Sequence, residues 1–103
     1  MNNQIEYIIC AAIHYPDIPV KLKHNPNNIQ TGVVLCGRRH HNIIELASIS
    51  IPRLLTLTSI QGFITSHNRF VDRIEALNIA KQADQIVDTG QIKGSQLYSE
   101  DLY

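Results

Sequence analysis

The sequence lacks the excess of positive charge, the long apolar run and the basic N-terminal stretch that mark nucleic-acid-binding, membrane and secreted proteins. Its 103 residues hold nine Lys plus Arg and nine Asp plus Glu, so the formal net charge is zero. A balanced chain lacks the broad basic surface that binds nucleic acid, and we expect neither DNA nor RNA as a partner. No apolar run approaches the ~18 residues of a membrane helix, so we expect no membrane contact. Residues 1–15 have no basic stretch, unlike a secretion signal.

Cysteine and clustered histidine are also scarce. Cys10 and Cys36 each lie inside an apolar run, which excludes a disulfide framework and predicts buried, inert, reduced thiols of a cytosolic protein. His40 and His41 are adjacent and point apart, and no C-x-x-C or H-x-x-x-H pair exists, so we expect no metal. The sequence has no P-loop, no G-x-S-x-G and no paired H-x-T signature of a phosphoesterase. We therefore expect a protein without cofactor that is not an enzyme.

Apolar residues make up 44% of the chain and charged residues 17%, as in an ordinary globular domain that also gains by association. Ile5–Tyr15 is almost continuously apolar and predicts a strand buried on both faces. The Pro- and Asn-rich residues 16–31 predict a long hairpin connection with an edge strand around Val20–Lys23. Gly32–Gly37 predicts a second strand, antiparallel to the first. A third strand is predicted from Gly62.

Two segments change to a helical period. Asn42 and Glu45 have capping-box spacing before a helix that Pro52 ends at about Ile51. Asp72 and Glu75 repeat that spacing before a second helix, which runs to about Gln85.

The predicted fold class is therefore α+β, with a small antiparallel sheet packed against two helices in a single domain. Residues 1–37 form a β-rich part with the long loop, 38–85 a helix-strand-helix part, and 86–103 a tail. Leu and Tyr of the tail are expected to dock on the body or on a neighbouring subunit.

Arginines precede both predicted helices. Arg38 and Arg39 lie before the first helix, and Arg69 and Arg73 flank the start of the second. Free N–H groups at a helix start and guanidinium forks together favour a phosphate group. The alternative interpretation is that these side chains are solvated or pair with nearby carboxylates such as Glu75.

Other side chains could complete such a site. Asp72 is a candidate acceptor for ribose hydroxyl groups. Phe63, Phe70 and Tyr15 are candidates to stack on a base.

Three stretches resemble a known family. They are "GRRHHNII" at 37–44, "QGFITSHNRFVDRIEALNIA" at 61–80 and "LYSEDLY" at 97–103. They are similar to small phage proteins of the first-described Thoeris anti-defence family. This chain departs from the family pattern in its longer 16–31 connection.

The resemblance implies a binding protein rather than an enzyme. Members sequester a cyclic ADP-ribose isomer made by a bacterial TIR-domain enzyme, do not cleave it, and assemble as homo-oligomers. Some are similar to proteins that take up cyclic oligonucleotides at a separate site, which adds cyclic di- or trinucleotides as candidate ligands. The localisation implied is the host bacterial cytoplasm. Arg69 and Arg73 match the family's R-F-V-[DN]-R motif and would contact phosphate, whereas Arg38, Arg39 and His41 match a more variable basic turn.

Two other functions remain open from the residues. One is an enzyme that hydrolyses a cyclic nucleotide messenger, with His40 or His41 as acid or base. The other is a protein inhibitor without small ligand, whose arginines bind an acidic protein.

Overall fold

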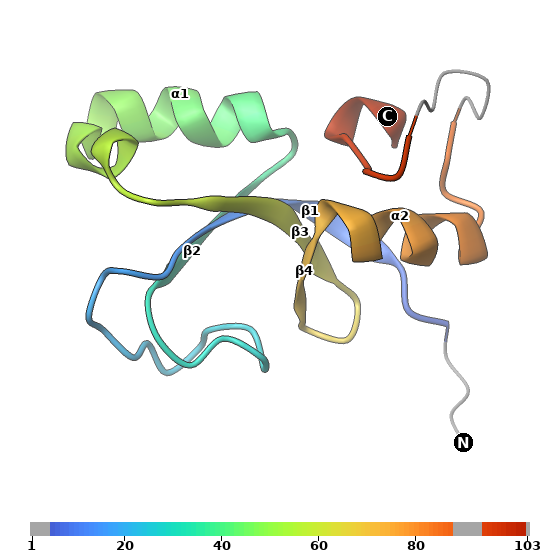
Figure 1. The fold of residues 1–103 in the computed structure, drawn as a ribbon, viewed down its shortest axis with the longest axis horizontal. Coiled ribbons are helices and arrows are strands. Elements are labelled where there is room, and N and C mark those ends of the chain that lie inside the picture. Colours follow the sequence, from blue (N-terminus) through green and yellow to red (C-terminus); the bar gives the residue numbers. More distant parts are fainter. Residues whose placement is uncertain (1–4, 88–93, 103) are drawn as a thin grey trace.

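The computed structural model describes residues 5–87 and 94–102 and confirms the α+β class. Four antiparallel strands form one sheet in the order β2-β1-β3-β4, with α1 and α2 on the same side (Figure 1). The strands are β1 (Ile8–Tyr15), β2 (Val33–Gly37), β3 (Ile60–Thr65) and β4 (Phe70–Asp72). The helices are α1 (His40–Ser50) and α2 (Arg73–Gln82), with short 3-10 helices η1 (Pro52–Thr56) and η3 (Ser99–Asp101).

Strand β1 is central, and residues 11–15 are buried on both faces as the apolar sequence predicts, whereas Ile9 is exposed. Ala11, Ile13 and Tyr15 join the core cluster, which also contains Ile43 and Ala47 of α1. Residues two apart lie on one face of a strand, so His14 points to the opposite face. There its Nε2 lies 3.0 Å from the Thr31 carbonyl oxygen. The strand begins at Ile8 rather than Ile5.

The long connection at 16–32 covers the sheet face opposite the helices. It lies below the sheet in Figure 1 and reaches the β3–β4 turn, where the Asn27 N–H donates to the Asn68 carbonyl at 2.7 Å. The Asn28 amide group accepts from the Phe70 N–H and donates to the Phe70 carbonyl. The edge strand predicted around Val20–Lys23 is wrong, because only a single bridge pairs Lys21 with Gly32. Asparagine side chains replace strand pairing here.

Helix α1 starts earlier than predicted. Arg39 is the N-cap residue, and the Asn42 side chain accepts from its N–H at 3.0 Å. The predicted capping role of Asn42 is therefore wrong, since it is the third residue of the helix. The end of the helix before Pro52 is confirmed, and the next residues form η1.

Helix α2 has the predicted cap. The Asp72 carboxylate accepts from the Glu75 N–H at 2.9 Å, which satisfies one of the free amide groups of the first turn. The preceding turn is also confirmed, with Asn68 in the left-handed region at φ 58°. The helix ends at Gln82 instead of about Gln85.

The structure describes residues 86–87 and 94–102 of the tail, and the second of these stretches docks on the body. Leu97 is 0% exposed and Leu102 is 7% exposed, and both belong to the core cluster. The Leu97 N–H donates to the Arg73 carbonyl at 2.9 Å. The remaining tail positions, 88–93 and 103, lie outside the described residues.

The expectation of two buried thiols is wrong. Cys36 is exposed and Cys10 is half-buried. Among the described residues, no helix is long and apolar enough to cross a bilayer.

Candidate functional site

Arg69 is held by two carboxylates rather than presented to solvent. Its Nε and one terminal nitrogen donate to the two Glu6 oxygens, each at 2.9 Å, and that nitrogen also donates to Glu75 at 2.9 Å. The Arg69 guanidinium lowers the pKa of Glu6 to about 2, with a further contribution from the Thr65 hydroxyl. The same contacts raise the pKa of Arg69. This network joins three segments and occupies the guanidinium that the sequence assigned to phosphate.

Arg73 has a different environment. It is the first residue of α2, and its guanidinium lies over the Tyr98 ring, 4.5 Å from the ring centroid. One terminal nitrogen donates to the Gln61 side-chain oxygen. Its Nε is buried without a hydrogen-bond partner among the described residues. A buried donor without a partner costs free energy that an incoming acceptor could recover.

A surface hollow of about 320 Å³ opens beside Arg73. Its other lining residues are Gln61, Asp72, Ile74 and Gln96. The hollow therefore combines one cation, one carboxylate and two amide side chains at the start of a helix. That set of donors and acceptors suits a ligand with both phosphate and hydroxyl groups.

At the start of α1, the buried side chain is His40. It is 6% exposed, its Nε2 lies 2.8 Å from the Gly62 carbonyl oxygen, and its ring packs edge-on against Phe63. Its Nδ1 lies 3.5 Å from the Ser99 hydroxyl. Burial lowers the pKa of His40, and the charge of Arg73 lowers it further.

The tail brings the two helix starts together. Arg39 lies 3.7 Å from a Glu100 oxygen, while Arg73 lies against Tyr98. In Figure 1 the helices run apart from a shared centre, and the C-terminal segment lies above that centre. We call the residues gathered there the helix-start cluster: Arg39, His40, Gln61, Arg73, Tyr98, Ser99 and Glu100.

The structure thus groups the arginines differently from the sequence analysis, which paired Arg38 with Arg39 and Arg69 with Arg73. Arg39 and Arg73 both contact the tail, whereas Arg69 bonds to Glu6 and Glu75 and Arg73 contacts Gln61 and Tyr98. Arg38 and His41 are exposed at the start of α1. The predicted convergence of Arg69 and Arg73 is wrong, because β4 separates them and carboxylates hold Arg69.

The predicted stacking residues lie in the wrong place. Phe63, Phe70 and Tyr15 are 0%, 8% and 3% exposed, so no ring face is open to a base in this conformation. These residues are core side chains of the sheet. Tyr98, which is 44% exposed, is the aromatic residue at the site.

Sequence reasoning missed Tyr98, Gln61 and Gln96. The motif "LYSEDLY" was a signal for Tyr98, but nothing local placed it on Arg73. Within the part of the chain that the structure describes, no group of three or more His, Cys, Asp or Glu could hold a metal ion.

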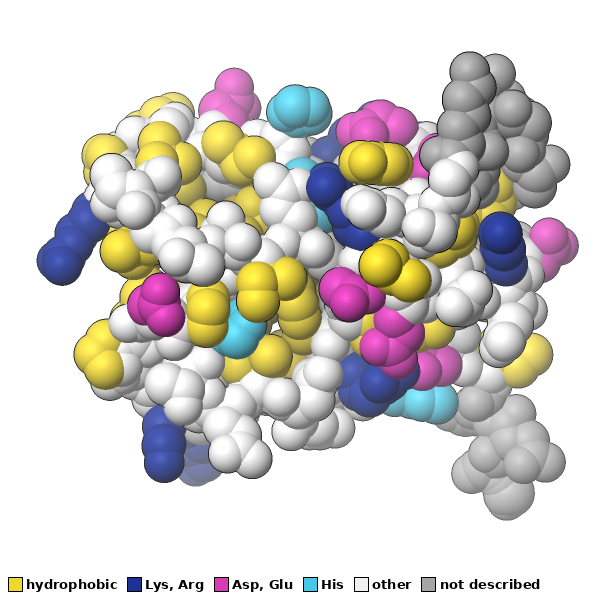
Figure 2. All heavy atoms as spheres, in the orientation of Figure 1, with side chains coloured by type: hydrophobic (Ala, Val, Ile, Leu, Met, Phe, Trp, Pro, Cys, Tyr) yellow, Lys and Arg dark blue, Asp and Glu magenta, His cyan; other side chains and the backbone are white. Residues whose placement is uncertain are grey.

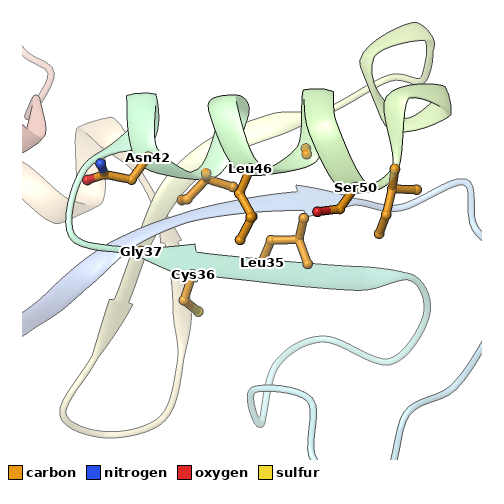
Figure 3. A pocket seen from close by; sticks show the side chains of 9 residues that line it. Leu35, Cys36, Gly37, Asn42, Leu46 and Ser50 are labelled. Carbon is orange, nitrogen blue, oxygen red and sulfur yellow. The ribbon is translucent and has the colours of Figure 1, made fainter.

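A solvent-exposed apolar patch lies over α1 and η1. Leu46, Ile49, Ile51 and Leu55 are 65%, 76%, 48% and 51% exposed, and we call these residues the α1 patch. Hydrophobic side chains gather over this helix in Figure 2. Between α1 and β2 lies an apolar pocket of about 270 Å³, into which Leu35 and Leu46 point (Figure 3).

The chain also matches a known protein family. The family model described as phage T4 y16D protein matches residues 7–103, which includes both helix starts and the tail. No curated protein and no solved structure matches the chain. A match of this extent covers the whole sheet, both helices and the described tail. The chain therefore belongs to the phage T4 y16D protein family.

Proposed function

We propose that this phage protein binds a cyclic ADP-ribose isomer in the host bacterial cytoplasm and holds it without cleaving it. Capture of this messenger would keep the host Thoeris effector inactive. The observation that carries the proposal is Arg73, whose guanidinium lies over Tyr98 and has a buried, unpartnered Nε beside an open hollow. The resemblance of the surrounding motif to the Thoeris anti-defence family supports the same ligand class.

The hollow offers a group for each part of such a ligand. Arg73 and the first amide groups of α2 would receive the pyrophosphate, since a helix start carries partial positive charge. The Asp72 carboxylate, which already accepts from the helix, has a second oxygen for ribose hydroxyl groups. Gln61 and Gln96 provide amide donors and acceptors at the rim. Tyr98 replaces the phenylalanines as the proposed stacking partner.

Binding without reaction needs no general base. His40, one of the two candidate catalytic residues, is buried, and both ring nitrogens face protein atoms. A histidine in this setting is better suited to joining β3, α1 and the tail than to transferring a proton to a ligand. These contacts favour the binding function over hydrolysis by His40.

Assembly as a homo-oligomer is the second part of the proposal. The α1 patch places four exposed apolar side chains on neighbouring elements, and such patches commonly mark protein interfaces. The chain is small, so association would bury apolar surface that the monomer leaves in water. Cyclic di- and trinucleotides are further candidate ligands of the assembled protein.

The experiment that tests the function starts with purified protein and cyclic ADP-ribose isomers. After incubation, the protein is washed, heat-denatured and its supernatant analysed by mass spectrometry. Recovery of the intact isomer supports sequestration. A product of changed mass would instead indicate hydrolysis.

Thermal-shift measurement distinguishes a small-ligand-binding protein from the alternative of a protein inhibitor without small ligand. A rise in melting temperature with one isomer, or with a cyclic dinucleotide, supports a small-ligand site. No shift with any of them would favour an inhibitor that binds an acidic protein.

A further inference from the structure

The two cysteines share one face of the sheet. Ala12 of β1 pairs with Cys36 of β2, and Cys10 lies two residues before Ala12. Residues two apart on a strand point the same way, so both thiols lie on the face opposite the helices. Figure 3 shows Cys36 pointing away from α1, whereas Leu35 points toward it. The cysteines are thus diagonal neighbours on adjacent strands.

This thiol pair is open to solvent. Cys36 is exposed, Cys10 is half-buried, and Cys36 lines a hollow of about 460 Å³ beneath the sheet. The 16–32 connection forms the other wall of this hollow, with Lys23, His24 and Asn25. A small molecule could therefore reach the Cys36 sulfur without any rearrangement of the core.

The two thiols differ in acidity. Interaction with the Cys10 thiol lowers the pKa of Cys36 to about 7. The same interaction and burial raise the pKa of Cys10. Cys36 is also the more exposed thiol and the one that lines the hollow, so it is the thiol that an incoming disulfide meets first, with Cys10 beside it.

We propose that Cys36 and Cys10 form a thiol–disulfide exchange site for low-molecular-weight disulfides. The Cys36 thiolate attacks one sulfur of the disulfide, which forms a mixed disulfide and releases one small thiolate. Cys10 then loses its proton and attacks the Cys36 sulfur, which forms the Cys10–Cys36 disulfide and releases the second small thiol. The protein loses two protons and two electrons, and the small disulfide takes them up and is reduced to two thiols.

The side chains that line the hollow beside Cys36 favour small disulfides of one charge type. Lys23 carries a positive charge, and His24 gains one when protonated, so a disulfide with carboxylate groups is favoured. Oxidised glutathione is a suitable probe of this class. This site lies on the opposite face of the sheet from the helix-start cluster, and its chemistry does not depend on the proposed function.

Intact-mass measurement of the full chain with oxidised glutathione tests the proposal. The native protein should become lighter by two hydrogen atoms, with only a transient adduct. Cys10→Ser should accumulate the glutathione adduct on Cys36, because no thiol resolves it. Cys36→Ser should react more slowly than Cys10→Ser by about tenfold or more.

Three results would overturn the proposal. They are a stable adduct on the native protein, no reaction at all, or equal reaction rates of the two serine variants. Circular dichroism of each variant verifies the fold, and reaction of the oxidised native protein with a small dithiol should restore the original mass.

Discussion

The guanidinium of Arg73 lies over the ring of Tyr98, although 25 positions separate them in the sequence. Arg73 starts α2 and Tyr98 precedes η3, so this contact fastens the tail to the start of the helix. A cation over an exposed aromatic ring contributes about 0.5–1 kcal/mol. The contact also fixes the guanidinium at the edge of the hollow, where the proposed ligand binds.

The first prediction concerns this ring. Tyr98→Leu should weaken binding of a cyclic ADP-ribose isomer by about threefold to tenfold, because the ring no longer orients Arg73 or stacks on the ligand. Tyr98→Phe keeps the ring and should bind like the native protein. Calorimetric titration of both variants measures the difference, and equal weakening in both would assign the effect to the hydroxyl group instead.

The second prediction concerns Arg69. Arg69→Ala should lower the free energy of unfolding at pH 7 by about 2 kcal/mol, because it leaves Glu6 without its charged donor. Ligand affinity should change little, since the guanidinium is committed to Glu6 and Glu75. Urea denaturation and titration of the same variant measure the two effects. A large loss of affinity with unchanged stability would contradict this prediction and would indicate that Arg69 contacts the ligand.

The pH dependence of Glu6 gives a third prediction. Its pKa is lowered from 4.5 to about 2 in the folded protein. The unfolded state therefore takes up its proton first, so this stabilisation is complete above about pH 4.5 and is lost as the pH falls toward 2. Glu6→Gln should show a shallower acid loss of unfolding free energy across that range. Parallel curves for the two proteins would show that Glu6 does not contribute.

The fourth prediction concerns His40, which is expected to change the free energy of unfolding at higher pH than Glu6 does. Burial lowers its pKa below 6.5, so the unfolded state binds the proton more readily than the folded state. Its stabilisation is present above about pH 6.5 and declines as the pH falls below that value. His40→Gln keeps a donor toward the Gly62 carbonyl and should flatten the stability curve below about pH 6.5. Denaturation curves at several pH values measure this, and an unchanged slope would contradict it.

Local signals were sufficient for much of the fold. The Asp72 cap was predictable because its acceptor and the Glu75 amide are three residues apart. The central strand was predictable because most of its apolar residues, those at 11–15, are buried on both faces. Asn42 misled the prediction because the helix begins two residues before it, and its side chain bonds back to Arg39.

The site itself was only partly predictable. The sequence indicated arginines at both helix starts, but their partners are distant: Glu6 lies 63 positions from Arg69, and Glu100 lies 61 positions from Arg39. Such pairs depend on the tertiary fold, which local spacing does not encode. The tail was expected to dock, but only the burial of Leu97 shows that it meets the start of α2.

The α1 patch gives the fifth prediction. Ile49→Glu should shift the protein toward its monomer mass of 11.6 kDa, because a charge in the middle of an apolar interface is costly. Ile74→Glu is the matched control, since Ile74 is 53% exposed on α2 outside the patch. Light scattering after size-exclusion chromatography measures both masses. A native protein that already runs as a monomer would contradict the proposed assembly.

The most direct test of the account is calorimetric titration of Arg73→Ala with the cyclic ADP-ribose isomer that the native protein binds. Arg53→Ala is the control, because it removes the same charge from an exposed side chain on η1. We expect at least about tenfold weaker binding for Arg73→Ala, equivalent to ~1.4 kcal/mol, and native affinity for Arg53→Ala. Native affinity in Arg73→Ala would contradict the claim that the ligand is captured at the start of α2.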